Sequence, residues 1–132
     1  MSASGYVLDS FALLVLLQKE VGYGRVEALL KSAVNGEAVV HISSMNLAEV
    51  HCQVLRKGKD TSRILAALEA LPLKIASADV YMSRAVDLRA QYGVAFGHCF
   101  AAALAYDLNC PLVTGDREFR KLGSTLRIEW LR

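Results

Sequence analysis

Short apolar runs alternate with longer segments of mixed polarity along the whole chain. The short runs are rich in β-branched residues and predict strands over residues 5–8, 38–42, 73–76, 112–114 and 126–131. The longer segments place apolar residues at helical spacing and predict helices over residues 10–19, 24–34, 44–57, 60–70, 77–91, 98–108 and 117–122. Strands that alternate with helices form parallel sheets covered on both faces, so the pattern predicts an α/β fold.

The composition supports a single packed domain over residues 1–132. Hydrophobic residues make up 54% and charged residues 21% of the chain, and no repeat or long linker interrupts it. The apolar run at residues 11–17 is far shorter than the roughly 20 residues that span a bilayer, and Asp9 stands just before it. We therefore expect a soluble cytoplasmic protein with no membrane segment and no targeting segment.

The net charge of the chain limits how it could bind nucleic acid. The net charge of +2 excludes a strongly basic nucleic-acid-binding chain, so phosphate contacts must come from local clusters. Two local clusters of basic residues, at 56–59 and 117–121, are the candidates for phosphate contact. Cations placed at solvated helix ends explain both clusters equally well.

The three cysteines lack metal-type spacing and predict buried free thiols in a reducing compartment. The apolar stripes of residues 10–17 and 64–71 are wide for one core and suggest a homodimer.

Three carboxylates form the main candidate site. Asp9, Glu49 and Asp116 each stand at or beyond the end of a short apolar run. The carboxyl ends of parallel strands border the crevice in which open α/β sheets bind ligands, so these acids can meet there. Mg²⁺ prefers oxygen ligands, and bound Mg²⁺ or Mn²⁺ polarises phosphoryl oxygens and lowers the pKa of a bound water. The pattern therefore predicts metal-dependent phosphodiester hydrolysis.

Each acid also has a structural interpretation. Asp9 can cap the helix that follows it, Asp116 can close a turn, and Glu49 can form a capping box with Asn46. Their recurrence at equivalent strand-to-helix junctions favours a shared site over three independent caps. A fourth position of similar appearance carries His98, which by itself reads as a helix-start residue. The other two histidines look structural and lack the spacing of a metal pair.

Four segments together resemble the PIN-domain ribonucleases, and more closely the toxins of VapBC toxin–antitoxin pairs. These segments are residues 6–10, 46–50, 96–105 and 112–119. The resemblance implies a three-layer α/β/α sandwich with a mostly parallel sheet of four to five strands, ordered 3-2-1-4 with a fifth strand at the edge. It also implies RNA cleavage with Mg²⁺ or Mn²⁺, a homodimer, and a small antitoxin that places a C-terminal segment in the acidic cleft. DNA would be contacted only through that antitoxin.

The resemblance assigns a role to each candidate residue. Asp9 resembles the metal ligand that follows the first strand, and Glu49 resembles the acid carried on a helix. Asp116 resembles the last acid, which stands behind a metal-facing Thr114. Ser10 is a supporting residue whose hydroxyl could hold a water or a phosphate oxygen, with helix capping as the alternative.

His98 departs from the family pattern, which has aspartate at this position as a direct or near-direct metal ligand. An imidazole removes one negative charge and replaces a hard oxygen with a softer nitrogen, which disfavours Mg²⁺ and favours Mn²⁺ or other transition metals. Three interpretations remain open: an active nuclease with a tuned site, an inactive member that keeps its partner, and a substitution selected or engineered to abolish toxicity.

We therefore predict a metal-dependent endoribonuclease toxin of a type II toxin–antitoxin system. Asp9, Glu49, His98 and Asp116 are its predicted catalytic and metal-binding residues. The alternative is a catalytically inactive PIN-fold module that still binds the antitoxin. A phosphoacceptor receiver domain is disfavoured, because it needs a pair of acids after the first strand and here Asp9 stands alone.

Overall fold

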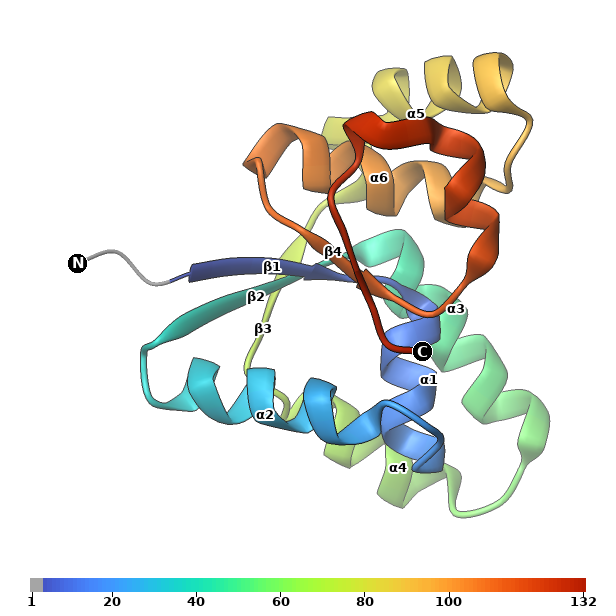
Figure 1. Cartoon of the computed structure of the whole chain (residues 1–132). Helices are drawn as coiled ribbons and strands as arrows, with labels where there is room; N and C mark the ends of the chain where they lie inside the picture. Colours follow the sequence, from blue (N-terminus) through green and yellow to red (C-terminus); the bar gives the residue numbers. More distant parts are fainter. Residues whose placement is uncertain (1–3) are drawn as a thin grey trace.

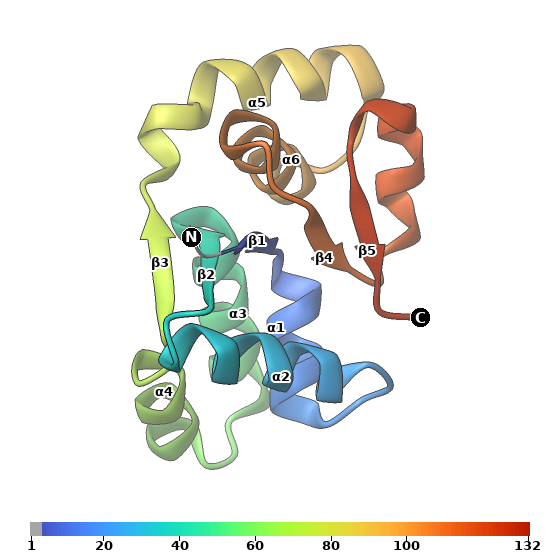
Figure 2. The ribbon, with the colours of Figure 1, turned by 60° about the vertical axis from the view of Figure 1, so that its left-hand side comes forward.

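The computed structural model describes residues 4–132 and follows the predicted alternation of strands and helices. Within these residues one sheet contains five strands: β1 (Ser4–Leu8), β2 (Ala38–Ser43), β3 (Leu73–Ala76), β4 (Leu112–Thr114) and β5 (Ile128–Trp130). Their order is β3-β2-β1-β4-β5, and every neighbouring pair is parallel (Figure 2). The predicted parallel sheet and the strand order implied by the resemblance are confirmed.

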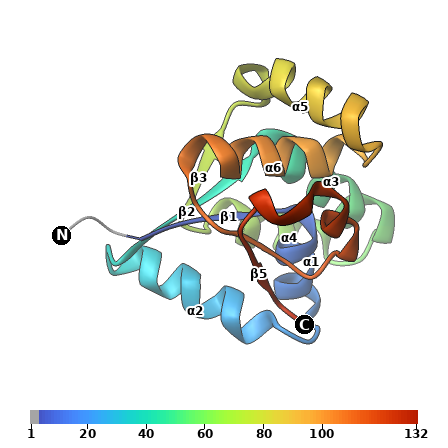
Figure 3. The ribbon, with the colours of Figure 1, turned by 45° about the horizontal axis from the view of Figure 1, so that its top comes forward.

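Helices cover both faces of this sheet. They are α1 (Ser10–Gln18), α2 (Tyr23–Val34), α3 (Ser44–Lys57), α4 (Thr61–Glu69), α5 (Ala78–Tyr92), α6 (Phe96–Leu108) and a 3-10 helix, η1 (Arg117–Thr125). Helices α1, α2 and α4 lie on one side of the sheet, and α6 lies on the other with α5 outside it (Figure 1, Figure 3). The expected three-layer α/β/α sandwich is confirmed.

Adjacent residues of the central strands point to opposite faces and build two cores. Val7 of β1 and Leu112 of β4 pack with α5 and α6, whereas Leu8 and Val113 pack with α1 to α4. All four side chains are fully buried. Burial on both faces explains why these strands read as continuous apolar runs in the sequence.

Local capping signals set the helix boundaries near the carboxyl end of the sheet. Asp9 is the N-cap of α1, and its Oδ1 accepts a hydrogen bond from the Ala12 backbone N–H at 2.9 Å. The Ser43 hydroxyl caps α3 by accepting from the Met45 backbone N–H at 3.2 Å. Gly58 ends α3 with φ 69°, a left-handed conformation that glycine adopts without steric cost. The predicted start and end of α3 are therefore confirmed.

Residues 93–95 connect two helices, although they resemble the end of a strand in the sequence. The Val94 side chain is buried, and its carbonyl accepts a hydrogen bond from Arg89 Nη1 at 2.7 Å. Helix α6 begins directly after this connection, at Phe96, and not at the predicted residue 98. His98 consequently lies in the first turn of α6 and does not follow a strand, unlike Asp9 and Asp116.

Surface exposure corrects one expectation from the sequence. Cys52 is exposed, contrary to the prediction, because it lies away from the buried side of α3 formed by Asn46, Val50 and Val54. The apolar residues of α1 and α4 pack against the core, and several of them are only partly buried. No helix in the described range is long and apolar enough to cross a membrane.

Candidate active site

A small pocket opens at the carboxyl ends of β1 and β4. The residues that line it are Asp9, Ser10, Asn46, Glu49, Ala95, Gly97, His98 and Asp116. The structure thus brings together the three predicted acids and the predicted histidine. The pocket has a volume of about 160 Å³, several times the roughly 30 Å³ that one water occupies in the liquid. It has room for a hydrated ion.

Asp9 is a helix cap and a pocket residue at the same time. Only 3% of its surface is exposed. One carboxylate oxygen accepts from the Ala12 backbone N–H, and the other accepts from the Thr114 hydroxyl at 2.5 Å. Burial away from water raises the pKa of Asp9 to about 7, because these hydrogen bonds offset only part of the cost of burying the charge. A cation in the pocket would favour the charged form.

Thr114 joins two of the acids and is absent from the lining of the pocket. Its buried hydroxyl donates to Asp9 Oδ2 and accepts from the Asp116 backbone N–H at 3.0 Å. Thr114 therefore orients the two acids, whereas the resemblance implied a metal-facing side chain. Ser10 does line the pocket. Because Asp9 provides the cap of α1, the capping alternative for Ser10 is not needed.

Glu49 reaches the pocket from within α3 and does not lie at a strand-to-helix junction. Asn46, one turn earlier, donates its Nδ2 to Glu49 Oε1 at 2.9 Å and to the Gly97 carbonyl at 3.0 Å. The capping-box interpretation is therefore wrong, because Ser43 is the cap and Asn46 is buried inside the helix. Gly97 allows this approach, since a Cβ there would lie 2.6 Å from Glu49 Oε1.

Asn46 is a pocket residue that the sequence reasoning missed. Its side chain is almost fully buried, and its Oδ1 has no hydrogen-bond partner among the described residues. A buried oxygen without a donor is costly, so it is a candidate contact for a cation or an ordered water. The signal in the sequence was the spacing of Asn46 and Glu49, which places both on one face of a helix.

His98 and Asp116 form a pair at the edge of the pocket. His98 Nε2 lies 2.8 Å from Asp116 Oδ2, and Asp116 Oδ1 accepts from the Glu118 backbone N–H at 3.0 Å. Burial alone would raise the pKa of Asp116, but the hydrogen bonds from His98 and Glu118 lower it. The imidazole also packs edge-on against Phe119, with ring centroids 4.7 Å apart. Its buried Nδ1 has no partner in the described structure, which favours the tautomer that donates from Nε2 to Asp116.

The oxygen atoms in the pocket suit a divalent cation that keeps several of its waters better than a cation bound only by protein side chains. In the described part of the chain, no three His, Cys, Asp or Glu side chains are grouped closely enough to hold an ion as they stand. Mg²⁺ commonly keeps several waters and binds proteins through one or two carboxylates, so it does not require such a cluster. The buried Asp9 carboxylate and the unpaired Asn46 oxygen provide hard ligands of the right kind.

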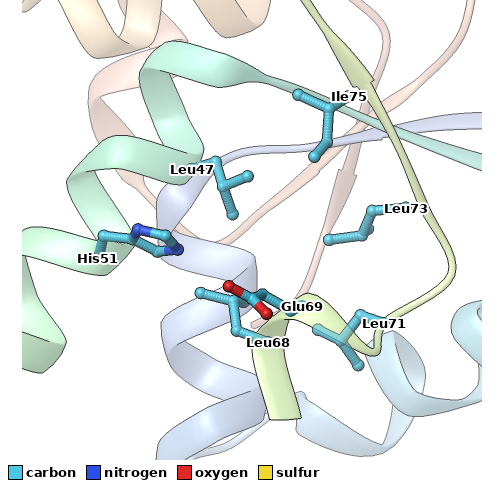
Figure 4. A pocket seen from close by; sticks show the side chains of 7 residues that line it. All are labelled: Leu47, His51, Leu68, Glu69, Leu71, Leu73 and Ile75. Atoms are coloured by element: carbon cyan, nitrogen blue, oxygen red, sulfur yellow. The ribbon is translucent and has the colours of Figure 1, made fainter. Parts of the chain in front are cut away.

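The remaining histidines lie outside this pocket. His51 of α3 lines an apolar groove with residues of α4 and β3, as Figure 4 shows. His41 belongs to β2, where burial lowers its pKa and Lys74 adds to the effect. These placements agree with the structural interpretation of both residues.

Comparison with solved structures shows the same fold in toxin–antitoxin proteins. The chain is 22% identical, with a TM-score of 0.67, to a protein in the VapBC2 structure of Rickettsia felis bound to a promoter DNA fragment, covering 95% of this chain and 97% of that one. It is 21% identical, with a TM-score of 0.70, to one in DNA-bound VapBC of Salmonella typhimurium, covering all of both chains. The Mycobacterium tuberculosis toxin VapC20, described as cleaving the sarcin-ricin loop, is 16% identical with a TM-score of 0.71, covering 92% of this chain and 98% of that one.

Comparison with families gives the assignment. Among curated proteins, none matches the chain. The PIN domain family model matches residues 6–124, which include Asp9, Glu49, His98 and Asp116, most of β1 and all of β2, β3 and β4. This protein therefore belongs to the PIN domain family.

Proposed function

We propose that this protein is a VapC-type toxin: a metal-dependent endoribonuclease that cleaves RNA phosphodiesters in a type II toxin–antitoxin system. The observation that carries the proposal is the meeting of Asp9, Glu49 and Asp116 in one pocket of a PIN domain. Carboxylates brought together in a cleft repel one another, and a bound cation is the ordinary reason for such an arrangement. The fold shared with toxin–antitoxin proteins supports the choice of family branch.

Mg²⁺ or Mn²⁺ is the proposed cofactor, bound among Asp9, Glu49, Asp116 and His98 through one or two direct carboxylate contacts and through waters. When bound, such an ion lowers the pKa of a coordinated water and stabilises charge on phosphate oxygens. Thr114 and the first turn of α1 fix the Asp9 carboxylate. Asn46 and Thr114 give Glu49 and Asp116 similar support, and Ser10 offers a hydroxyl to a phosphate oxygen or a water.

The second candidate is a catalytically inactive PIN-fold module that retains antitoxin binding. One observation favours it: the His98 imidazole contacts the Asp116 carboxylate oxygen that a metal would otherwise use. Replacement of the expected aspartate also leaves the pocket with one negative charge fewer. Tight antitoxin binding without RNA cleavage in any divalent metal would identify this candidate.

The proposed partners follow from the proposed branch of the family. They are an RNA substrate, a small antitoxin that fills the acidic pocket with a C-terminal segment, and a second copy of the chain in a homodimer. Contact with DNA would come only through the antitoxin, and the expected location is the cytoplasm. We also propose that residues 1–132 work as one PIN domain.

The proposed activity is tested by incubating the purified protein with total RNA in Mg²⁺, in Mn²⁺ and in EDTA. We expect endonucleolytic products that depend on the metal and are more abundant with Mn²⁺, because imidazole suits the softer ion. Glu49→Gln is the matched control, since it keeps the size of the side chain and removes its charge. Equal cleavage in EDTA, or equal cleavage by Glu49→Gln, would contradict a metal-dependent site.

Gly97→Ala tests the position of Glu49. A Cβ at residue 97 would overlap the Glu49 carboxylate, so we expect the carboxylate to move and cleavage to fall roughly 10- to 100-fold. Folding should be little affected, because alanine is the better helix former in α6. Gly24→Ala in α2 is the control, as nothing lies within 4 Å of a Cβ there. Cleavage at the parent rate by Gly97→Ala would show that the observed position of Glu49 is not required.

A further inference from the structure

Aromatic rings stacked with arginines begin directly beside the acidic pocket. Phe11 follows the pocket residue Ser10, and its ring lies against Gly115, where a Cβ would come within 2.5 Å of Phe11 Cε1. Gly115 in turn precedes the pocket residue Asp116. The Arg132 guanidinium lies over the Phe11 ring, 4.8 Å from its centroid. A ring covered by a guanidinium therefore lies beside the pocket, next to the segments that carry Ser10 and Asp116.

The same arrangement continues to β5. Arg117 Nη2 donates to the main-chain oxygen of Arg132 at 2.8 Å. The guanidinium groups of Arg117 and Arg120 lie 5.1 and 5.9 Å from the centroid of the Trp130 ring. We call Phe11, Arg117, Arg120, Trp130 and Arg132 the arginine–aromatic strip. Its rings are half-buried and its three arginines are exposed.

Among residues 4–132, no side-chain carboxylate forms an ion pair with the arginines of the strip. Side-chain ion pairs in residues 4–132 join Arg25 to Glu129, Arg63 to Asp60, His98 to Asp116 and Lys121 to Glu118. The positive charge of the strip is therefore not neutralised by a neighbouring carboxylate. Stacking on a ring occupies the face of a guanidinium and leaves its N–H groups at the edge, where they can bind an anion. The rings also restrict the arginine side chains, which reduces the entropy lost when a ligand binds.

We propose that the arginine–aromatic strip binds the phosphates of single-stranded RNA and guides the strand into the acidic pocket. This inference depends on the proposed function, because it assumes that RNA is the substrate. A pocket lined by carboxylates repels a phosphate backbone, and the net charge of only +2 gives no general attraction. A cationic strip that adjoins the pocket and has no carboxylate partner among residues 4–132 can supply that attraction locally. Positive grooves with aromatic rings are the ordinary surface for single strands.

The α6 rim of the pocket carries another pair of the same kind. Phe96 lies between the pocket residues Ala95 and Gly97, and the Arg89 guanidinium is 5.5 Å from the centroid of its ring. Phe96 is 47% exposed, so its ring is accessible at the surface. An RNA strand that crosses the pocket toward α6 would meet a second stacked guanidinium.

The test measures the affinity of a fluorescein-labelled single-stranded oligoribonucleotide by anisotropy over a range of salt concentrations. The protein carries Asp9→Asn throughout, so that cleavage does not interfere. We expect Arg120→Gln to weaken binding roughly tenfold, and Arg117→Gln with Arg120→Gln to weaken it further. The slope of log affinity against log salt should fall by about 0.7 for each phosphate contact removed. Arg120 makes no hydrogen bond within the described structure, so its replacement should not disturb folding.

Arg84→Gln is the matched control, because Arg84 is exposed and stacks on Tyr106 at 5.2 Å, in a hollow formed by α5 and α6 away from the pocket. It should leave affinity and salt slope unchanged. An RNA duplex of the same sequence should bind more weakly than the single strand. Unchanged binding in the double variant, an equal loss in Arg84→Gln, or equal affinity for the duplex would overturn this inference. Absence of cleavage by the parent protein would instead contradict the proposed function, which the binding assay does not require.

Discussion

His98→Asp should raise Mg²⁺-dependent RNA cleavage by roughly 10² to 10³, the effect expected of one restored ligand charge in a metal site. The gain should be larger in Mg²⁺ than in Mn²⁺, because imidazole already serves the softer ion better. The substitution removes the hydrogen bond from His98 Nε2 to Asp116 and places a second carboxylate near Asp116. Initial cleavage rates of both proteins in each metal give the comparison, and toxicity on expression should accompany the gain.

The same substitution should have an opposite effect on stability without metal. Two neighbouring carboxylates repel each other when no cation separates them, so His98→Asp should melt at a lower temperature than the parent protein in EDTA. Added Mg²⁺ should recover the difference, since a ligand that binds only the folded state stabilises it. His98→Asn is the control, because it removes the imidazole without adding charge. If His98→Asp leaves Mg²⁺-dependent cleavage unchanged or lowers it, the prediction is wrong and His98 itself contributes to the function of the site.

Asp9→Asn should reduce cleavage by roughly 10² or more, because it removes the charge of the most deeply buried of the proposed metal ligands. Asparagine is as good an N-cap as aspartate, so the hydrogen bond from the Ala12 N–H should survive and the fold should be kept. Cleavage rates and melting curves of the two proteins test both statements. Cleavage at the parent rate would exclude Asp9 from the site.

The pH dependence of stability separates Asp9 from a purely structural cap. Burial raises its pKa in the folded state to about 7, above the ordinary 3.8 of an unfolded aspartate. The stabilisation due to this group is therefore complete below about pH 4 and is lost as the pH rises through 7. In EDTA, the melting temperature of Asp9→Asn relative to the parent protein should rise between pH 5 and pH 8. If the difference in melting temperature between the two proteins does not change with pH, the raised pKa of the buried Asp9 carboxyl is contradicted.

The sequence alone determined the fold because most of its signals are local. Asp9, Ser43 and Gly58 set helix ends through hydrogen bonds or backbone conformations that involve residues at most a few positions away. The alternation of short apolar runs with helical segments indicated a parallel sheet covered on both faces, and Val7 and Leu8 are indeed buried in different cores. Such signals carry no information about distant partners, but they are enough to fix the order of strands and helices.

Tertiary structure decided how the candidate site is built. Thr114 and Asp9 are 105 residues apart, Asn46 and Gly97 are 51 apart, and the contacts between them exist only because the crossovers bring β1, β4, α3 and α6 together. The sequence analysis placed Glu49 at a strand-to-helix junction. In the structure Glu49 lies within α3, and it reaches the pocket because Gly97 of α6 has no side chain in its way.

Tertiary structure also decided two further features: the pairing of His98 with Asp116 and the arginine–aromatic strip beside the pocket. His98 and Asp116 are 18 residues apart, and no periodicity in the sequence relates them. Arg132 meets Phe11 because the chain beyond β5 lies at the carboxyl edge of the sheet, next to the start of α1. Local propensity therefore determined which elements form, while side-chain contacts over long sequence separations determined which acids meet, which donors hold them, and where positive charge borders the pocket.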